Sequence, residues 1–180
     1  ELVRGVVLSG SPRSVRDAGA PRFELDAIKG KLPLLGVCYG AQYLAHFFGG
    51  KVEASPSREY GRARMQVVKG DDPLMQGLQK ESQVWMSHGD TITTIPEGYH
   101  IIASTEDVPV AAYRIAAEQT WGIQFHPEVY HSEEGFKMLE NFVVGICGCQ
   151  QSWTPASFVE STVKELREKL GDDKVVLGLS

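Results

Sequence analysis

The strongest constraint on the fold is an apolar run at residues 33–37 that leads into a helical pattern at residues 41–48 through a tight turn. A similar apolar run at residues 5–9 precedes it, and residues 21–29 read as a helix between the two runs. Short apolar runs that alternate with helical patterns are typical of a parallel sheet covered by helices. We therefore predict an α/β domain with a central, mostly parallel sheet.

The middle of the chain has a different rhythm, in which strand-like runs are separated by short turns such as Pro96-Glu97-Gly98. The runs cover residues 63–68, 82–86, 99–105, 110–115 and 120–125. Strands joined by short turns pair antiparallel, because a parallel neighbour needs a long crossover. A smaller antiparallel portion of sheet is therefore expected here.

The last part of the chain predicts two helices and a boundary between them. Ser132 is the expected N-cap of a helix that closes a first domain of residues 1–146. Residues 147–153 lack periodicity and are the predicted linker, after which Thr154 caps a second helix within residues 154–180. Apolar runs stand almost at both ends of the chain, so we expect it to be a fragment of a longer protein.

Composition argues against several classes of protein. The chain has 180 residues, 42% of them hydrophobic, which suits one ordinary globular core. Its formal net charge of −5 and its lack of a basic block argue against nucleic-acid binding. No apolar run approaches the roughly 20 residues that span a bilayer. We therefore expect a soluble, cytoplasmic protein without a membrane partner.

The cysteines predict neither a disulfide framework nor a metal site. There are three of them, Cys38, Cys147 and Cys149, and an odd number with two almost adjacent fits a reducing compartment. Cys147 and Cys149 also lack the further cysteine or histidine pair that a zinc site needs. No metal is therefore expected in this fragment.

A candidate nucleophile stands at the turn between the second apolar run and its helix. Gly36-Val37-Cys38-Tyr39-Gly40 is the cysteine counterpart of the nucleophile elbow, in which a sharp turn strains the central residue and glycines make room for neighbouring elements. A sulfur at the start of a helix lies at the positive end of the helix dipole, which favours the thiolate. Cys38 is therefore a candidate nucleophile, and a buried, inert cysteine is the alternative.

A candidate base and its orienting carboxylate stand at His126 and Glu128. In extended backbone the two-residue period puts Gln124, His126 and Glu128 on one face, so the carboxylate can reach the imidazole. Pro127 biases His126 toward such a backbone. Together with Cys38, these side chains have the residue types of a catalytic triad.

These motifs resemble those of a known family. Residues 36–42 together with Phe125-His126-Pro127-Glu128 are similar to the class I glutamine amidotransferases. Arg58-Glu59-Tyr60-Gly61 and Ser87-His88-Gly89-Asp90 resemble the amidotransferase domain of the GMP synthases. Residues 174–180 are similar to the strand that leads into the pyrophosphate loop of their ATP-pyrophosphatase domain. The resemblance covers nearly the whole chain and implies a flavodoxin-like, three-layer α/β domain.

The activity implied by the resemblance is hydrolysis of glutamine to glutamate and ammonia through a cysteine thioester. Cys38 matches the nucleophile, His126 the base, and Glu128 the residue that holds the imidazole. The ammonia aminates XMP to GMP in a synthetase domain, of which residues 154–180 would be the truncated start. ATP and Mg²⁺ are expected only in that missing domain, and no cofactor in this fragment. The implied partners are glutamine, the ATP-pyrophosphatase domain and a second copy in a full-length homodimer.

The resemblance also assigns two subsites. The oxyanion hole matches the backbone N–H of Tyr39 and the turn at Gly10 and Ser11. The residues that match the glutamine-binding site are Gln42, Ser87, His88, Gly89 and Asp90. Ser11 stands where the family has a glycine, and a serine there would resist a positive φ. The family's opening strand and helix are missing before the run at residues 5–9, which would leave a sheet edge exposed.

Two other functions compete with this one. The first is an amidotransferase subunit of another pathway, such as carbamoyl-phosphate or anthranilate synthesis, which would not need the helix after Thr154. The second is a non-catalytic module that binds glutamine or a partner domain without turnover.

Overall fold

The structure, a computed structural model, describes residues 3–176 and 178, without the side chains of residues 56–59. The chain divides into two compact units, residues 1–149 and residues 150–180. Among the described residues, no helix combines the length and the apolar character that a membrane span requires.

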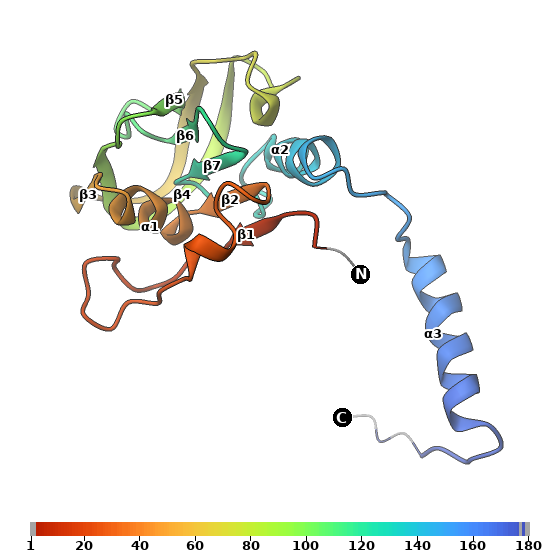
Figure 1. Ribbon diagram of the computed structural model, residues 1–180. Helices are drawn as coiled ribbons and strands as arrows, with labels where there is room; N and C mark the ends of the chain where they lie inside the picture. The colour runs from red at the N-terminus through yellow and green to blue at the C-terminus, as the bar shows by residue number, and fades with distance from the viewer. Residues whose placement is uncertain (1–2, 177, 179–180) are drawn as a thin grey trace. The chain divides into compact units, whose positions relative to one another are not determined.

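The first unit is built on one mixed sheet of seven strands (Figure 1). The strands are β1 (Val6–Leu8), β2 (Leu34–Val37), β3 (Lys51–Val67), β4 (Glu81–Thr94), β5 (Tyr99–Ser104), β6 (Ala112–Ile115) and β7 (Thr120–Ile123). The helical segments are α1 (Tyr39–Phe47), α2 (Gly135–Glu140), a π-helical segment (Asn141–Ile146) and two 3₁₀ turns (Leu25–Ala27 and Pro73–Met75). The order across the sheet is β1-β2-β7-β6-β5-β3-β4.

The parallel part of the sheet brings three chain segments to one edge. β1 pairs with β2, and β2 with β7, both in parallel. In this register Leu8 lies beside Gly36, and Gly36 beside Gly122. The carboxyl ends of the three strands therefore meet at the same edge, which is where open α/β sheets place their ligands.

The α/β class is confirmed, but the balance within the sheet differs from the expectation of a mostly parallel sheet with a smaller antiparallel portion. The four pairings β7–β6, β6–β5, β5–β3 and β3–β4 are antiparallel, against two parallel ones. The reason lies in the connections, because β5, β6 and β7 follow one another through short turns that leave no room for a crossover helix.

Two apolar cores cover the two faces of the sheet. Neighbouring residues of β2 divide between them, because successive side chains of a strand point to opposite faces: Leu34 packs in the core on the α1 face and Leu35 in the other. The second core includes Met138 of α2 and Phe142 of the π-helical segment. The unit therefore has three layers, with α1 on one face of the sheet and α2 on the other.

The helix predicted at residues 21–29 is not formed, apart from the 3₁₀ turn Leu25–Ala27. Two tyrosines of α1 bond the backbone of this segment instead. The hydroxyl of Tyr39 donates to the carbonyl of Pro21 at 2.5 Å, and the hydroxyl of Tyr43 donates to the carbonyl of Phe23 at 3.2 Å. These tertiary bonds satisfy backbone groups that a helix would otherwise pair internally.

Ser132 is not the N-cap predicted for the helix that follows. α2 begins at Gly135, its N-cap is Glu134, and no side chain bonds the cap. The hydroxyl of Ser132 is buried and engaged elsewhere, with backbone groups of His126 and Trp85. A tertiary contact has therefore overridden the local capping preference of serine.

The second unit consists of α3 (Pro155–Leu170) and its flanking residues. Thr154 and Ser157 form a capping box, in which each side chain accepts the other's backbone N–H at 3.0 and 2.8 Å. Pro155 occupies the first helical position and Gly171 ends the helix at φ 54°. Local signals alone place this helix, as the sequence predicted.

Candidate active site

Cys38 occupies a strained turn between β2 and α1. Its φ of 50° is the only positive value of a non-glycine residue in the described part of the chain. A Cβ at Gly36 would lie 2.7 Å from the backbone nitrogen of Ala41, and a Cβ at Gly40 would lie against the backbone of Leu8. The two glycines therefore permit the close approach of strand and helix that aims the cysteine outward from the sheet edge.

The surroundings of Cys38 favour the neutral thiol over the thiolate. The residue is 5% exposed, and its sulfur lies 3.9 Å from the carbonyl oxygen of Ser87, which accepts from a thiol and not from a thiolate. Burial raises the pKa of Cys38 to about 11, the backbone N–H of Tyr39 opposes the shift, and the charge of Glu128 adds to it. The helix terminus does favour the thiolate, as expected, through the N–H of Tyr39, but burial outweighs this contribution.

His126 is fixed by its carboxylate and by its own backbone. Its Nδ1 lies 2.6 Å from Oε1 of Glu128. Its backbone N–H donates to the carbonyl of Trp85 at 3.0 Å. Its carbonyl accepts from the hydroxyl of Ser132 at 2.5 Å, and the same hydroxyl accepts from the N–H of Trp85 at 3.1 Å. The loop after β7 is thus tied to β4 at the imidazole.

Gly10 marks the point where cysteine and histidine meet. A Cβ on Gly10 would lie 3.4 Å from Cε1 of His126 and 3.7 Å from Cβ of Cys38. These three residues follow β1, β2 and β7, whose carboxyl ends share one edge. No hydrogen bond joins the sulfur to the imidazole within the described residues. The geometry nevertheless brings Cys38 and the His126–Glu128 pair together beside Gly10.

A cleft of about 510 Å³ opens beside Cys38. One wall comes from the segment between β1 and the first 3₁₀ turn, including Ser11, Ser14 and Arg16. The opposite wall is the stretch Ser87–Asp90 of β4. The cleft has the size of a small-molecule site and polar groups on both sides.

A family model described as glutamine amidotransferase class-I matches residues 1–146. The chain belongs to this family. The match spans the parallel strands, the Cys38 turn and the His126 loop, so the family's sequence pattern and the geometry of the cleft lie on the same segment.

Relatives with curated names agree with this membership. The chain is 64% identical over 178 residues to a protein of Porphyromonas gingivalis named GMP synthase [glutamine-hydrolyzing], covering 99% of this chain and 35% of that protein. It is 60% identical over 180 residues to a protein of the same name from Bacteroides fragilis, covering 100% of this chain and 36% of that protein. The chain therefore spans about a third of the length of these relatives.

Solved structures share the fold. A protein of Thermoplasma acidophilum, provisionally named as a GMP synthase subunit, matches with a TM-score of 0.69 and 29% identity over 89% of this chain and 77% of that one. A glutamine amidotransferase of Methylobacillus flagellatus matches with a TM-score of 0.58 and 27% identity over 70% of this chain and 52% of that one.

In this amidotransferase domain the residues predicted to bind glutamine all line the cleft: Gln42, Ser87, His88, Gly89 and Asp90. The side-chain nitrogen of Gln42, however, donates to the backbone carbonyl of Asp90 at 2.7 Å and reaches Oε1 of Gln124 at 3.4 Å. Gln42 therefore holds Asp90 in place. Burial is the main cause that lowers the pKa of His88 to about 4, with His126 acting in the same direction, which favours the neutral imidazole near pH 7.

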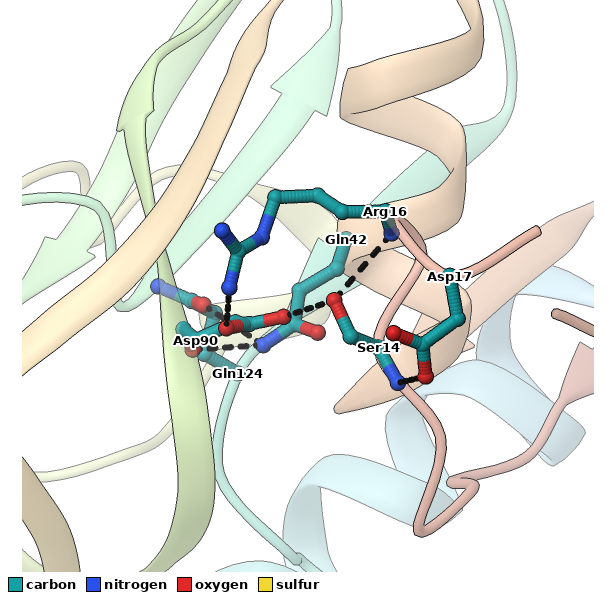
Figure 2. Close-up of polar contacts among 6 residues, drawn as sticks. All are labelled: Ser14, Arg16, Asp17, Gln42, Asp90 and Gln124. Atoms are coloured by element: carbon teal, nitrogen blue, oxygen red, sulfur yellow. Dashed lines mark hydrogen bonds and ion pairs between the residues drawn. The ribbon is translucent and has the colours of Figure 1, made fainter.

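The sequence analysis did not identify two side chains on the cleft wall that follows β1, those of Ser14 and Arg16. Nη2 of Arg16 lies 2.7 Å from Oδ1 of Asp90, and the hydroxyl of Ser14 donates to Oδ2 of the same carboxylate (Figure 2). The only signal available was their position in the loop after a parallel strand, where such folds build their sites. Nothing in the residue types predicted the partner, which lies more than seventy positions away.

The turn at Gly10 and Ser11, which the sequence predicted to form an oxyanion hole, is less strained than expected. Ser11 replaces the family's glycine, but neither Gly10 nor Ser11 has a positive φ, so a serine fits this backbone without penalty. The hydroxyl of Ser11 accepts from the N–H of Arg13 at 3.1 Å. The N–H of Tyr39 points at the sulfur of Cys38, which places this donor beside the proposed nucleophile.

In the described residues no group of three or more metal-binding side chains is present.

Proposed function

We propose that this amidotransferase domain hydrolyses the side-chain amide of glutamine, with Cys38 as nucleophile, His126 as general base and acid, and Glu128 as the group that orients the imidazole. The observation that carries the proposal is the convergence of Cys38 and the His126–Glu128 pair beside Gly10, with Cys38 itself lining a polar cleft. A nucleophile, a base and an orienting carboxylate in this arrangement suit acyl transfer.

The raised pKa of the thiol sets the order of the steps. Cys38 is neutral in the empty site, so its proton moves to Nε2 of His126 as the sulfur attacks the amide carbon. Glu128, 2.6 Å from Nδ1, stabilises the imidazolium that results. His126 returns the proton to the departing nitrogen, ammonia leaves, and water then hydrolyses the thioester to glutamate and the free thiol.

Backbone donors around Gly10 stabilise the tetrahedral oxyanion in this proposal. The N–H of Tyr39 follows the nucleophile, and the turn at Gly10 and Ser11 comes from the end of β1. Loss of one such donor typically costs about 3 kcal/mol of transition-state stabilisation. The amino-acid end of glutamine lies along Ser87, His88, Gly89 and Asp90, with Gln42 holding that wall.

For the longer protein, we propose that the ammonia aminates XMP to GMP in an ATP-pyrophosphatase domain. Support comes from the 64% and 60% identity to proteins named GMP synthase, of which this chain spans 35% and 36%. ATP and Mg²⁺ would bind in that domain, with residues 147–153 as linker and residues 154–180 as its beginning. A cytoplasmic location and a homodimer complete the proposal. The carbamoyl-phosphate and anthranilate alternatives are not favoured, because these relatives are named for GMP synthesis. The non-catalytic alternative is not favoured either, because the relatives are named as enzymes.

Labelling of Cys38 tests the proposal. A diazo-ketone analogue of glutamine is expected to modify Cys38 stoichiometrically, as read by mass spectrometry, with Cys147 and Cys149 left unmodified. Cys38→Ala is expected to abolish glutamine hydrolysis while circular dichroism and the melting temperature stay close to those of the unchanged chain. Turnover by the Cys38→Ala variant would refute the assignment.

A further inference from the structure

Two cysteines outside the cleft stand at the end of the first unit. Cys147 and Cys149 are both free thiols, and both are half-buried. They follow the π-helical segment Asn141–Ile146, and the unit ends at Cys149. The mechanism proposed above uses neither of them. Two nucleophilic side chains are thus left over at one place, with a single residue between them.

The residue between the two cysteines folds the chain back. Gly148 has a φ of 65°, in the left-handed region that glycine accepts and other residues resist. Two residues of a fully extended chain span at most about 7 Å. A disulfide joins Cα atoms that are roughly 4.4 to 6.8 Å apart. The turn at Gly148 shortens the span from its maximum and so brings the two cysteines within the range of a disulfide.

Backbone bonds hold both cysteines in this turn. The N–H of Cys147 donates to the carbonyl of Phe142 at 2.9 Å, and the N–H of Cys149 donates to the carbonyl of Val143 at 3.1 Å. The space beside Gly148 is open, because nothing lies within 4 Å of an added Cβ. A small reagent can therefore reach the turn while its backbone stays bonded.

The sulfur of Cys147 packs against the backbone just before β1. A Cβ on Gly5 would collide with this sulfur, so the glycine leaves the room that the sulfur fills. The side chain also packs against the core on the α2 face. Burial raises the pKa of Cys147, and the charge of a thiolate at Cys149 raises it further. The two sulfurs are therefore close enough to affect each other's charge.

We propose that Cys147 and Cys149 form a dithiol site that reacts with low-molecular-weight disulfides such as glutathione disulfide and closes to an internal disulfide. The thiolate of Cys149 attacks one sulfur of the reagent, which forms a mixed disulfide and releases one glutathione. The thiolate of Cys147 then attacks the sulfur of Cys149 and releases the second glutathione. The two protein thiols are oxidised, the reagent is reduced to two thiols, and the protons of the cysteines end on those thiols.

The order of the two attacks follows from the surroundings of Cys147. Its sulfur is packed against Gly5 and its pKa is raised, so little of it is present as the reactive thiolate. The second attack is intramolecular, and proximity compensates for a small thiolate fraction. The mixed disulfide also removes the charge on Cys149 that raises the pKa of Cys147.

A disulfide that spans one residue is easily reduced, because deviations from relaxed geometry store strain and make the bond more reducible. A reducing compartment therefore keeps the pair as two thiols and lets it close only when oxidised glutathione accumulates. Closure is reversible and fixes the chain at the point where the first unit ends.

Equilibration of the 180-residue chain in glutathione buffers tests the site. Free thiols are trapped by rapid alkylation, and the ratio of disulfide to dithiol at residues 147 and 149 is read by peptide mass spectrometry. At a fixed ratio of oxidised to reduced glutathione, tenfold more total glutathione should lower this ratio about tenfold, because closure releases two glutathione molecules for each one consumed. Modification that does not change with total glutathione would mean that each cysteine carries its own glutathione, which would overturn the proposal.

Cys147→Ser and Cys149→Ser are the matched controls, because each removes one of the two thiols. Each variant is expected to carry glutathione on its remaining cysteine, in an amount that does not depend on total glutathione. Glutamine hydrolysis by the reduced variants should equal that of the unchanged chain, since neither residue lines the cleft. A disulfide that joins either cysteine to Cys38, or one whose amount rises with protein concentration, would also overturn the proposal.

Discussion

Two sides of the candidate site are held in place by different means. The side that carries Cys38 and His126 is fixed by the backbone: the N–H of Cys38 donates to the carbonyl of Ile123 at 2.8 Å, and that of His126 to Trp85 at 3.0 Å. The side formed by residues 11–17 is held by side chains, those of Ser11, Ser14 and Arg16 among them.

This difference indicates a division of labour between chemistry and recognition. Backbone bonds and close glycine contacts fix reacting groups to within a fraction of an ångström, which acyl transfer requires. Side-chain bonds can be exchanged one at a time without moving the main chain. The groups proposed to react therefore lie on the rigid side, and the adaptable side supplies part of the cleft lining beside them.

The rigid side should respond most strongly to a single added carbon atom. In Gly40→Ala the new Cβ meets the backbone carbonyl of Leu8, so strand and helix must separate. We expect a loss of about 3 kcal/mol in the free energy of unfolding, measured by urea denaturation. Gly19→Ala, just beyond the adaptable side, is the matched control, because nothing lies within 4 Å of its new Cβ. Equal losses in the two variants would break the comparison.

The thiol of the rigid side should be unusually slow to react without a substrate. Because burial raises the pKa of Cys38 to about 11, its alkylation by iodoacetamide should rise about tenfold per pH unit from pH 7 to 10 and not level off near 8.5. Below both values its thiolate fraction is about a three-hundredth of that of an ordinary thiol.

The same shift links folding to pH. A thiol whose pKa is raised in the folded state stabilises the fold below about pH 8.5, and this contribution is lost as the pH rises through 11.

Glutathione provides the reference rate for the alkylation of Cys38 by iodoacetamide. A plateau of Cys38 alkylation below pH 9 would show that the empty site already holds a thiolate.

A smaller effect is expected at Ser132, which joins the His126 loop of the rigid side to β4. Ser132→Ala leaves the carbonyl of His126 and the N–H of Trp85 without their buried partner, at a cost of about 2 kcal/mol of stability. Since the His126 backbone loses one of its supports, kcat for glutamine hydrolysis should fall while KM changes little. Ser132→Thr keeps the hydroxyl and should recover most of kcat. A rise in KM alone would assign Ser132 to substrate binding instead.

The parts of the site that the sequence predicted are those set by local pattern. The turn at Cys38 followed from glycine spacing between a strand and a helix, and the contact of His126 with Glu128 followed from the two-residue period. The capping box at Thr154 is equally local. Each depends on residues within a few positions of one another, so one segment suffices to predict it.

The parts that escaped prediction depend on contacts between distant segments. Residues 21–29 have helical composition, but hydroxyl groups of Tyr39 and Tyr43 hold their backbone open. Ser132 has the sequence context of an N-cap, yet it bonds His126 and Trp85. The balance of parallel and antiparallel strands follows from which strands become neighbours. Such partners are chosen by the folded chain as a whole.

The contact of Gly40 with Leu8 has a consequence for redesign of this domain. Position 40 has no room for a side chain, so few single substitutions are tolerated at the turn that carries Cys38. Residues 11–17 rest on bonds that a neighbouring sequence can replace piece by piece. A library confined to that short loop would therefore sample new amide substrates while leaving the hydrolytic core as it is.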